Sequence, residues 1–419
     1  MKNSLLALFT LIASYGFGQS TSFSLDDLQR EPSADYSIHW RPDLWYNGYD
    51  GFKLGLKLNS QSISEKHEFN LAAWYATGML QNNTPEALEG EQQKVQLTAQ
   101  YSTLLGKWKP EAFIQSANGL LKYKLSASTI IFDNLRLNFG VQTWNRKTSS
   151  SLNYTWFANS YEQDAWNSSL FAGITKQIDN DKYQNQTTLA ARYGFLNDFT
   201  SENDYFFIEV ENHFQTTLTK KKSELRIRAY GRYGSAETPV ESQLYLAGAN
   251  PEQLESNPYT QARIGEQASF GNTQNHGFAL EGGLFLRGFA NYAAPIELNS
   301  NYASSGYRGS SGWAVNAEID FNKWISTTDF KSNFLRLRSY FFADIGQLSY
   351  TDEFLDLSGI SPLRADAGIG MRLDVKKWGK YSGLKQSYFR LDIPFWVNEV
   401  PSENSHFEFR TAFGFGILL

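Results

Sequence analysis

The chain has 419 residues with 38 basic and 43 acidic side chains, and its formal net charge is −5. Because basic and acidic residues are mixed along the chain, we expect no nucleic-acid partner. It contains no cysteine, which excludes a disulfide framework and a cysteine-linked lipid anchor. Its mean hydropathy is −0.44 and no later stretch approaches about 18 consecutive apolar residues, which excludes a helical membrane protein.

Residues 1–18 have the features of a secretory signal peptide. A basic residue precedes the apolar run 5–13, and Gly16 and Gly18 occupy the −3 and −1 positions of a cleavage site, which leaves Gln19 as the first residue of the mature chain. The apolar run is too short to span a bilayer. We therefore expect an exported protein.

Residues 19–49 are predicted to form an N-terminal periplasmic segment ahead of the first strand. The segment is shorter than the smallest folded domains, which need about 50 residues. Its last part, Trp40–Tyr49, is unusually aromatic. We expect it to anchor the chain at the membrane interface, and a docking peptide for a periplasmic partner is the alternative.

Segments in which apolar and polar residues alternate recur from residue 51 to the carboxyl terminus. Such alternation is typical of strands that separate lipid from a polar interior, and bacterial barrels have an even number of them. The segments are 51–59, 67–80, 92–104, 107–116, 119–129, 131–145, 153–163, 166–177, 184–196, 204–217, 223–234, 312–323, 334–349, 363–375, 385–396 and 406–419. We therefore predict an all-β fold, a transmembrane antiparallel β-barrel of about 16 strands that occupies residues 50–419.

The last of these segments is predicted to be the closing strand of the barrel. One of its faces is charged or glycine-rich. The other is formed by Phe407, Phe409, Phe413, Phe415 and Leu419. A barrel must pair its last strand, because an open edge in lipid leaves backbone groups without hydrogen bonds. This pattern predicts location in the outer membrane of a Gram-negative cell, with the membrane lipids as direct partners.

Residues 235–311 form by far the longest connection between predicted strands. With the carboxyl terminus in the periplasm, the alternation of strand ends places this connection outside the cell. Loops longer than about 15 residues without structure of their own are usually functional or disordered. The sequence therefore predicts a functional role for this loop and for the strands that flank it.

Four motifs follow one another in and after the loop. They are Gly282–Phe289, which contains Arg-Gly-Phe, then Gly312–Glu318, Phe341–Gly346 and Leu363–Gly370. Their order resembles the BamA/TamA superfamily of outer-membrane assembly and translocation barrels, of the bacterial surface antigen type. The resemblance is specific over residues 220–419 and generic before them. It implies a 16-stranded barrel whose sixth extracellular loop folds back into the lumen.

The resemblance also implies a set of site residues. The loop motif would be Arg287, Gly288 and Phe289. Its luminal partners would be Glu318, Asp344 and Gly346. Alternation along the strands independently places both carboxylates on polar faces, where an arginine can bind a carboxylate through two hydrogen bonds. The alternative is that the loop arginine is solvated and that Asp344 pairs with Arg336 or Arg338.

The sequence departs from that family in three ways. Members with assembly activity carry periplasmic POTRA domains, and this chain is predicted to lack them, as a barrel-only member would. The loop is expanded between Gly248 and Gly282 by polar residues, which indicates an added extracellular element. The chain ends in Leu419, where an aromatic residue is more usual.

The sequence offers little support for an enzyme. It has no His-Glu-x-x-His, no Gly-x-Ser-x-Gly, no P-loop and no cysteine nucleophile, and its 5 histidines are scattered, so we expect no catalytic residues, no metal site and no cofactor. Arginines on the predicted inner faces could select anions, but acidic residues share those faces, and mutual neutralisation is expected instead. The run Lys220–Lys222 is expected to be a solvated turn, with lipid phosphates as the alternative contact.

Three functions remain open from the sequence. The first is a subunit in outer-membrane protein assembly or export that works with periplasmic or outer-membrane partner proteins. The second is a passive small-solute channel, which requires the loop to leave the lumen. The third is a structural or surface-recognition barrel whose expanded loop contacts other proteins.

Overall fold

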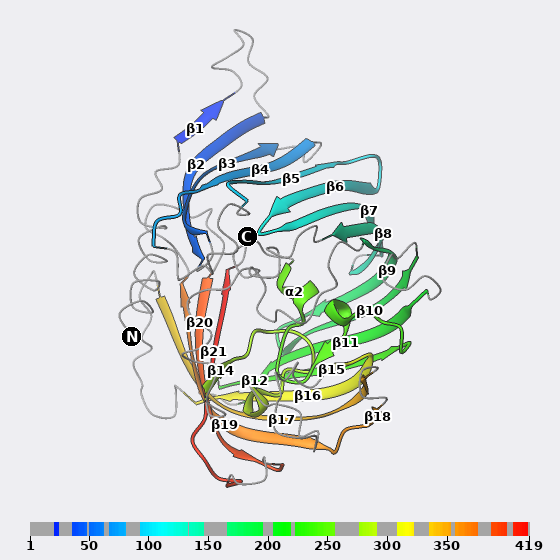
Figure 1. The fold of residues 1–419 in the computed structure, drawn as a ribbon, viewed down its shortest axis with the longest axis vertical. Coiled ribbons are helices and arrows are strands. Elements are labelled where there is room, and N and C mark those ends of the chain that lie inside the picture. The colour runs from blue at the N-terminus through cyan, green and yellow to red at the C-terminus, as the bar shows by residue number, and fades with distance from the viewer. Residues whose placement is uncertain are drawn as a thin grey trace. The chain divides into compact units, whose positions relative to one another are not determined.

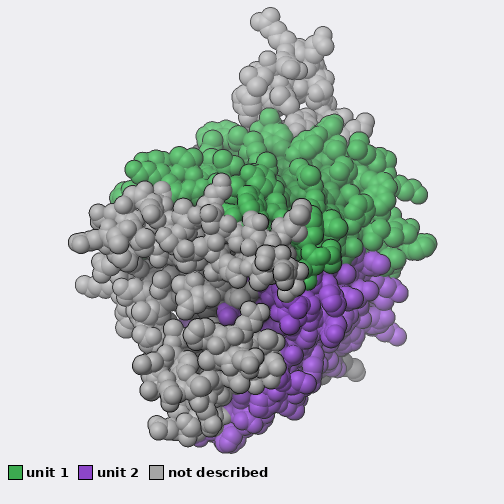
Figure 2. Space-filling view, turned by 45° about the vertical axis from the view of Figure 1, so that its right-hand side comes forward, with its two compact units in different colours: residues 1–172, 193–204, 261–267 green, residues 173–192, 205–260, 268–419 purple. Residues whose placement is uncertain are grey.

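The computed structural model divides the chain into two compact units that consist mainly of strands (Figures 1 and 2). Unit 1 comprises residues 1–172, 193–204 and 261–267, and unit 2 comprises residues 173–192, 205–260 and 268–419. The residues that the structure describes are 21–24, 36–47, 50–62, 67–80, 93–132, 134–145, 166–195, 204–218, 223–255, 276–290, 308–321, 335–352, 357–375, 387–399 and 405–417.

Unit 1 is built from strands that pair antiparallel with their neighbours in the chain, from β1 with β2 through to β7 with β8. The strands are β1 (Thr21–Ser24), β2 (Tyr36–Asn47), β3 (Gly51–Ser62), β4 (His67–Ala76), β5 (Val95–Thr103), β6 (Trp108–Ala117), β7 (Leu120–Phe132), β8 (Leu135–Asn145) and the first half of β9 (Trp166–Asp179). The β6–β7 hairpin turns through Asn118 and Gly119, whose φ angles are 53° and 73°. An Asn-Gly pair with two positive φ angles is the favoured two-residue hairpin turn.

Unit 2 continues the antiparallel pattern but contains the long loop. β11 pairs with β12, β12 with β16, β16 with β17, β17 with β19, β19 with β20 and β20 with β21, and the short β18 pairs antiparallel with the end of β17. The strands are the second half of β9, β10 (Tyr183–Gly194), β11 (Phe206–Thr217), β12 (Glu224–Gly234), β16 (Ser311–Asp320), β17 (Leu335–Asp352), β18 (Leu357–Ile360), β19 (Arg364–Val375), β20 (Ser387–Val397) and β21 (Thr411–Ile417). Because β12 and β16 are direct neighbours, the loop between them leaves and rejoins the sheet at one place.

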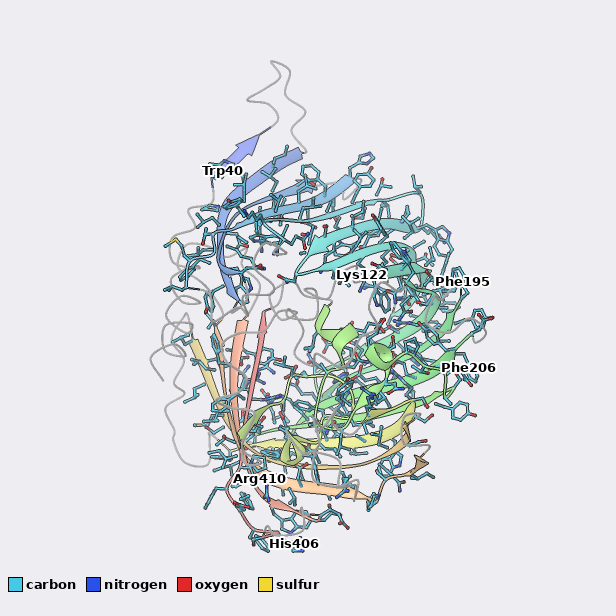
Figure 3. All side chains as sticks on the ribbon, in the orientation of Figure 1. Trp40, Lys122, Phe195, Phe206, His406 and Arg410 are labelled. Carbon is cyan, nitrogen blue, oxygen red and sulfur yellow. The ribbon has the colours of Figure 1, made fainter. Side chains whose placement is uncertain are left out.

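Each unit has an apolar exposed face and a polar buried face. On β7 the Leu125 side chain is 59% exposed, whereas Lys122 is 7% exposed. On β11 the aromatic ring of Phe206 lies on the exposed face, while Phe207 is buried (Figure 3). Large aliphatic and aromatic side chains exposed along successive strands, with polar residues between them, are typical of strands that face lipid on one side.

The polar face of unit 1 contains a lysine that is almost fully buried. Lys53 Nζ lies 2.8 Å from Asp50 Oδ2 and donates a hydrogen bond of 2.8 Å to Gln96 Oε1. It also donates to Asn118. Gln96 in turn donates to Asp50 at 2.8 Å. A buried ammonium group is tolerated only with such partners, and this cluster therefore joins the β2–β3 turn, β5 and the β6–β7 turn.

The predicted fold class is confirmed as all-β and antiparallel. Strands of seven or more residues number sixteen among the described residues, and they are the eleven from β2 to β12 together with β16, β17, β19, β20 and β21. Apart from β2, which no alternating segment predicts, and the shorter β21, their bounds agree with the alternating segments of the sequence to within a few residues. The faces of these strands are those of an outer-membrane β-barrel protein. The chain is located in the outer membrane.

Among the described residues, no helix is long and apolar enough to cross a membrane.

The amino-terminal part of the prediction needs correction. Residues 36–47, expected within the periplasmic segment 19–49, form β2 and pair with β3 along the whole of that strand. The aromatic stretch from Trp40 is therefore part of a strand over most of its length. The predicted strand at 153–163 and the predicted signal peptide at 1–18 lie outside the described residues.

The last strand, β21, is shorter than the sequence predicts. Regular pairing with β20 covers only β21, whereas Phe407 and Phe409 precede it and are 71% and 76% exposed. Three backbone hydrogen bonds still tie this approach to β20, from Glu408 N to Phe395 O at 3.1 Å, from Arg410 N to Pro394 O at 3.0 Å and from Val397 N to His406 O at 3.1 Å. Phe413 and Phe415 lie within β21, and Leu419 is outside the described residues.

A charge on the exposed face should destabilise the protein far more than one on the polar face. Leu125 lies near the middle of β7, so Leu125→Arg should lower the free energy of unfolding by about 2–4 kcal/mol, the cost of an arginine at the membrane midplane. Urea titration in lipid vesicles, followed by the heat-modifiable mobility of the folded protein, would measure this change. The control is Lys124→Arg on the opposite face. Equal stability of the two variants would contradict the assignment of the lipid face.

Candidate functional site

The loop between β12 and β16 folds back against the polar face of unit 2. Its described elements are η5 (Val240–Ser242), β13 (Leu244–Tyr245), α2 (Pro251–Glu255), β14 (His276–Phe278), η6 (Arg287–Phe289) and β15 (Arg308–Gly309). β13 pairs with β15, and η6 lies against β19 and β20. An apolar cluster joins loop and sheet through Leu244, Leu246, Leu284, Leu286 and Phe289 from the loop and Tyr230, Ala314, Leu348 and Val397 from the strands. Burial of these side chains holds the loop in place.

A tight turn directs the loop toward the sheet just before the Arg-Gly-Phe motif. Gly282, Gly283 and Phe285 have φ angles of 144°, 53° and 58°. A Cβ on Gly283 would lie 2.2 Å from Gly248 O, so only glycine fits there. Gly283 O also accepts a hydrogen bond of 2.8 Å from Arg228 Nη2. The turn is therefore fixed by backbone sterics and by one arginine of β12.

Arg287 is the centre of the site, and its side chain is completely buried. Its Nε and Nη2 donate hydrogen bonds of 2.8 Å each to the two carboxylate oxygens of Asp344, and its backbone N donates to the same group at 3.2 Å. Its Nη1 donates to Glu318 Oε1 at 2.6 Å. The guanidinium carbon also lies 3.9 Å from the centre of the Phe342 ring. One arginine thus fixes the loop to β16 and β17 through two carboxylates and an aromatic face.

Asn316 orients the carboxylate and the loop together. It lies between Glu318 and Ala314 on the polar face of β16, and it is the cross-strand partner of Asp344. Its Nδ2 donates to Asp344 Oδ1 at 3.1 Å and to Phe285 O at 2.9 Å. Its Oδ1 accepts from Arg228 Nη1 at 3.0 Å. The loop backbone is therefore held by the same amide that positions the carboxylate.

Further charged residues on β19 and β20 surround this group. Asp392 Oδ1 lies 3.7 Å from Arg287 Nη1 and accepts a hydrogen bond of 2.7 Å from Tyr340. Asp392 is also paired with Arg390 at 2.7 Å. Asp366, which is 1% exposed, is the direct cross-strand partner of Asp344. Four carboxylates therefore meet two arginines in a largely buried region, where unpaired charge would be costly.

The motif glycine permits this close approach. A Cβ on Gly288 would lie 2.5 Å from Asp366 Cβ and 2.8 Å from Val397 Cγ1. Phe289 next to it is 1% exposed and belongs to the apolar cluster. Gly346, the last predicted partner, lies on β17, and a Cβ there would be 2.6 Å from Trp313 O. Gly346 thus serves the pairing of β16 with β17 and makes no contact with Arg287 that the structure describes.

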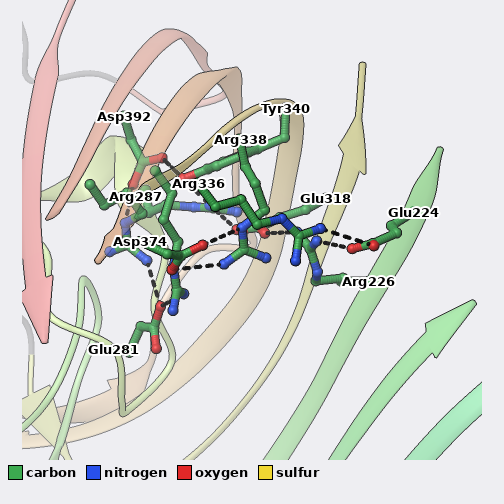
Figure 4. Close-up of polar contacts among 12 residues, drawn as sticks. Glu224, Arg226, Glu281, Arg287, Glu318, Arg336, Arg338, Tyr340, Asp374 and Asp392 are labelled. Carbon is green, nitrogen blue, oxygen red and sulfur yellow. Dashed lines mark hydrogen bonds and ion pairs between the residues drawn. The ribbon is translucent and has the colours of Figure 1, made fainter. Parts of the chain in front are cut away.

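The alternative partners of Asp344 are occupied elsewhere. Arg336 pairs with Glu224 at 3.2 Å, and Arg338 pairs with Asp374 at 2.8 Å (Figure 4). Six further arginines of the polar face are also ion-paired. These pairs are Arg226 with Glu224, Arg228 with Glu211, Arg232 with Glu209, Arg372 with Asp374, Arg390 with Asp392 and Arg410 with Glu408. The polar face of unit 2 is therefore largely self-neutralised.

The structure adds residues that sequence reasoning did not assign to the site. Asp392, Asn316 and Tyr340 contact Arg287 or its carboxylates, and Glu281 pairs with Arg372 and Arg390. Alternation had placed most of these side chains on polar faces. Their meeting point depends on strand register, which alternation does not give. Among the described residues, no group of His, Asp and Glu has the arrangement of a metal site.

No protein-family model and no curated protein sequence matches the chain. Solved structures do show a likeness. CdiB from Escherichia coli has a TM-score of 0.47 at 12% identity, over 91% of this chain and 62% of that protein, so the chain spans less than two thirds of its length. BamA from Haemophilus ducreyi lacking POTRA domains 1–3 has a TM-score of 0.42 at 12% identity, over 99% and 78%. OccK8 (OprE) from Pseudomonas aeruginosa has a TM-score of 0.38 at 10% identity, over 86% and 83%. At these values the likeness carries no information on activity.

Removing one member of the buried ion group should cost more than removing any exposed arginine. Arg287→Ala should lower the free energy of unfolding by about 3–5 kcal/mol, because it leaves two carboxylates buried without their cation. The double variant with Asp344→Ala should be less than additive. Urea titration of the four proteins of this cycle would measure the coupling. The control is Arg136→Ala, an exposed arginine of β8. Full additivity would place the two residues in separate interactions.

Gly288 should not tolerate a side chain even as small as a methyl group. Gly288→Ala should lower the free energy of unfolding by about 1–3 kcal/mol, because the new Cβ overlaps Asp366 and Val397. Gly231→Ala on β12 is the matched control, since its Cβ would meet nothing closer than Val210 Cγ1 at 3.7 Å. Thermal unfolding in detergent would compare the two. A larger loss for the control would contradict the close packing of Gly288 against β19 and β20.

Proposed function

We propose that this chain is the barrel subunit of a machinery that assembles outer-membrane proteins or exports proteins, and that it works with periplasmic or outer-membrane partner proteins. The observation that carries the proposal is the complete burial of Arg287 in contact with Glu318 and Asp344. A loop that merely covers a barrel has no need to bury a guanidinium, because burial of a charge costs free energy unless several partners compensate it. Such a contact favours a loop whose position inside the barrel is itself functional.

The sequence supports the same proposal. The motif order over residues 220–419 resembles the BamA/TamA superfamily, and that resemblance implies the same arginine, glutamate and aspartate as loop anchors. Lipids of the outer membrane surround the exposed apolar face. Partner proteins would act with the barrel from the periplasm or within the outer membrane.

The polar face of unit 2 argues against a simple solute channel. A selective pore needs charges that face water and are free to act on a passing ion. Here the arginines of that face are ion-paired, and the apolar cluster with Leu284 and Leu286 covers part of it. A loop with these contacts obstructs passage along unit 2. We therefore favour assembly or export over passive diffusion.

Depletion of the protein in its native host would test this function. We expect the amount of folded, heat-modifiable outer-membrane proteins to fall, and we expect recovery with the unaltered chain and with Arg136→Ala but not with Arg287→Ala. In planar bilayers the purified protein should show low and fluctuating conductance, because the loop stays in place. Normal outer-membrane protein levels after depletion, together with large steady currents, would establish the channel instead.

A further inference from the structure

The last strand of the sheet has a short partner that comes from the long loop. β20 pairs antiparallel with residues 412–417 of β21. β14 pairs in parallel with residues 411–413 of the same strand, with His276 opposite Thr411 and Phe278 opposite Phe413 (Figure 1). A backbone hydrogen bond of 2.9 Å from Ala279 N to Phe413 O continues this pairing. Because β20 occupies one edge of β21, β14 must occupy the other.

An open strand edge is a pairing site for any extended segment. Its unpaired N–H and C=O groups attract another strand, and in lipid they cannot remain without partners. β14 covers this edge over only three residues, and parallel pairing is slightly less stable per residue than antiparallel pairing. The edge of β21 is therefore occupied, but by a partner that can be displaced.

A glutamate three residues after β14 holds this segment in place. Glu281 Oε1 lies 3.1 Å from Arg372 Nη1 and 3.2 Å from Arg390 Nη1 (Figure 4). Arg390 Nη2 also donates a hydrogen bond of 2.6 Å to Ala279 O. The Glu281 side chain is 47% exposed, in contrast to the completely buried Arg287. An ion pair with this exposure is weak and is screened by salt.

The two attachments of the loop rest largely on different contacts. The Gly282–Phe285 turn lies between them, and two glycines with positive φ angles form its first half. Residues 284–289 are held by the apolar cluster and by the buried ion group. Residues 276–281 are held by three strand pairs, by hydrogen bonds of Ala279 to Phe413 and Arg390, by an apolar cluster of Ala279 with Phe285, Ala290 and Ala412, and by one partly exposed carboxylate. Release of the second part breaks the contacts of Ala279, but it leaves the ion pairs of Arg287 and the apolar cluster with Leu284 and Leu286 in place.

We propose that β14 is a resident edge strand that keeps β21 from pairing with other chains, and that Glu281 is the latch that holds it there. Its displacement opens the edge of β21 to an extended segment of a protein handled by the machinery, which pairs by adding a strand. This partner class rests on the proposed function, whereas the latch itself does not. The latch concerns only contacts within unit 2.

Hydrogen exchange of the purified protein would test the latch without any cellular assay. Glu281→Gln should speed exchange of the Ala279 amide by roughly fivefold, the effect of losing a partly exposed ion pair. Added salt should speed exchange in the unaltered protein and have less effect in the variant. The matched control is Glu237→Gln, an exposed glutamate of the same loop. Unchanged exchange in Glu281→Gln, or an equal change in Glu237→Gln, would overturn the latch.

A peptide probe would test the edge itself. The chain has no cysteine, so Thr411→Cys introduces a single reactive thiol on β21. The probe is a synthetic peptide of residues 272–281 in which cysteine replaces His276. We expect it to form a disulfide with Thr411→Cys severalfold faster when Glu281→Gln is also present, and a peptide of scrambled order should not. Equal rates with and without the latch, or with both peptides, would overturn the resident strand.

The double variant His276→Cys with Thr411→Cys separates this inference from the proposed function. Oxidation should lock β14 in place, and exchange of the Ala279 amide should then stay slow even with Glu281→Gln. If the locked protein fails to restore outer-membrane protein levels and the reduced protein succeeds, release of β14 is required in the cell. If the locked protein restores them fully, the edge has no role there, although the assembly function stands.

Discussion

The buried guanidinium of Arg287 is the interaction on which the rest of unit 2 depends. A charge removed from water has to be compensated by partners at fixed distances, and here those partners come from β16, β17 and β20. Their geometry requires the observed strand register, because Asn316 lies opposite Asp344 and Asp344 opposite Asp366. The same geometry fixes the loop turn and excludes a side chain at Gly288. Loop position and strand register are thus mutually dependent.

Much of the fold could be predicted from the sequence because a strand between lipid and a polar interior leaves a two-residue pattern. β7 and β12 are clear examples, with leucine or isoleucine alternating with lysine or arginine. β2 lacks a clear pattern of this kind, for a physical reason. Pro42 interrupts its middle, and its aromatic residues lie on both faces, since Trp45 is buried and Trp40 is exposed. Proline is tolerated at strand edges, and the short β1 covers only residues 37–40 of β2.

The site was only partly accessible from the sequence. Alternation placed Glu318 and Asp344 on polar faces, and the family resemblance singled out Arg287. Neither the alternation nor the resemblance could assign Asp392 or Asn316 to the site. Their contribution depends on the register of neighbouring strands, which the sequence does not give. The ion pairs of Glu281 could not be predicted from the sequence either. Glu281 lies in a loop without periodicity, and its partners are more than ninety positions away in the sequence. Contacts of this kind are set by tertiary structure alone.

The interior electrostatics of unit 2 also explain why so many charges coexist with a stable sheet. Nearly every arginine on the polar face has a carboxylate on the same strand or on a neighbouring one, such as Arg232 with Glu209 and Arg338 with Asp374. Ion pairs between adjacent strands form as soon as those strands pair. They therefore favour one strand register at little additional cost in conformational entropy. The long-range pair of Arg287 is of a different kind, because it joins a loop to strands that are complete without it.

The direct pairing of β12 with β16 has a consequence for how this protein can change over evolutionary time. The loop begins at Gly234 and ends at Ser311, and these two residues are hydrogen-bonded to each other at 2.9 Å. Both ends are therefore fixed at one point, whatever the length of chain between them. The closure entropy of such an excursion grows only with the logarithm of its length. Whole segments can be gained or lost at its outer part while the strand register and the arginine below stay unchanged.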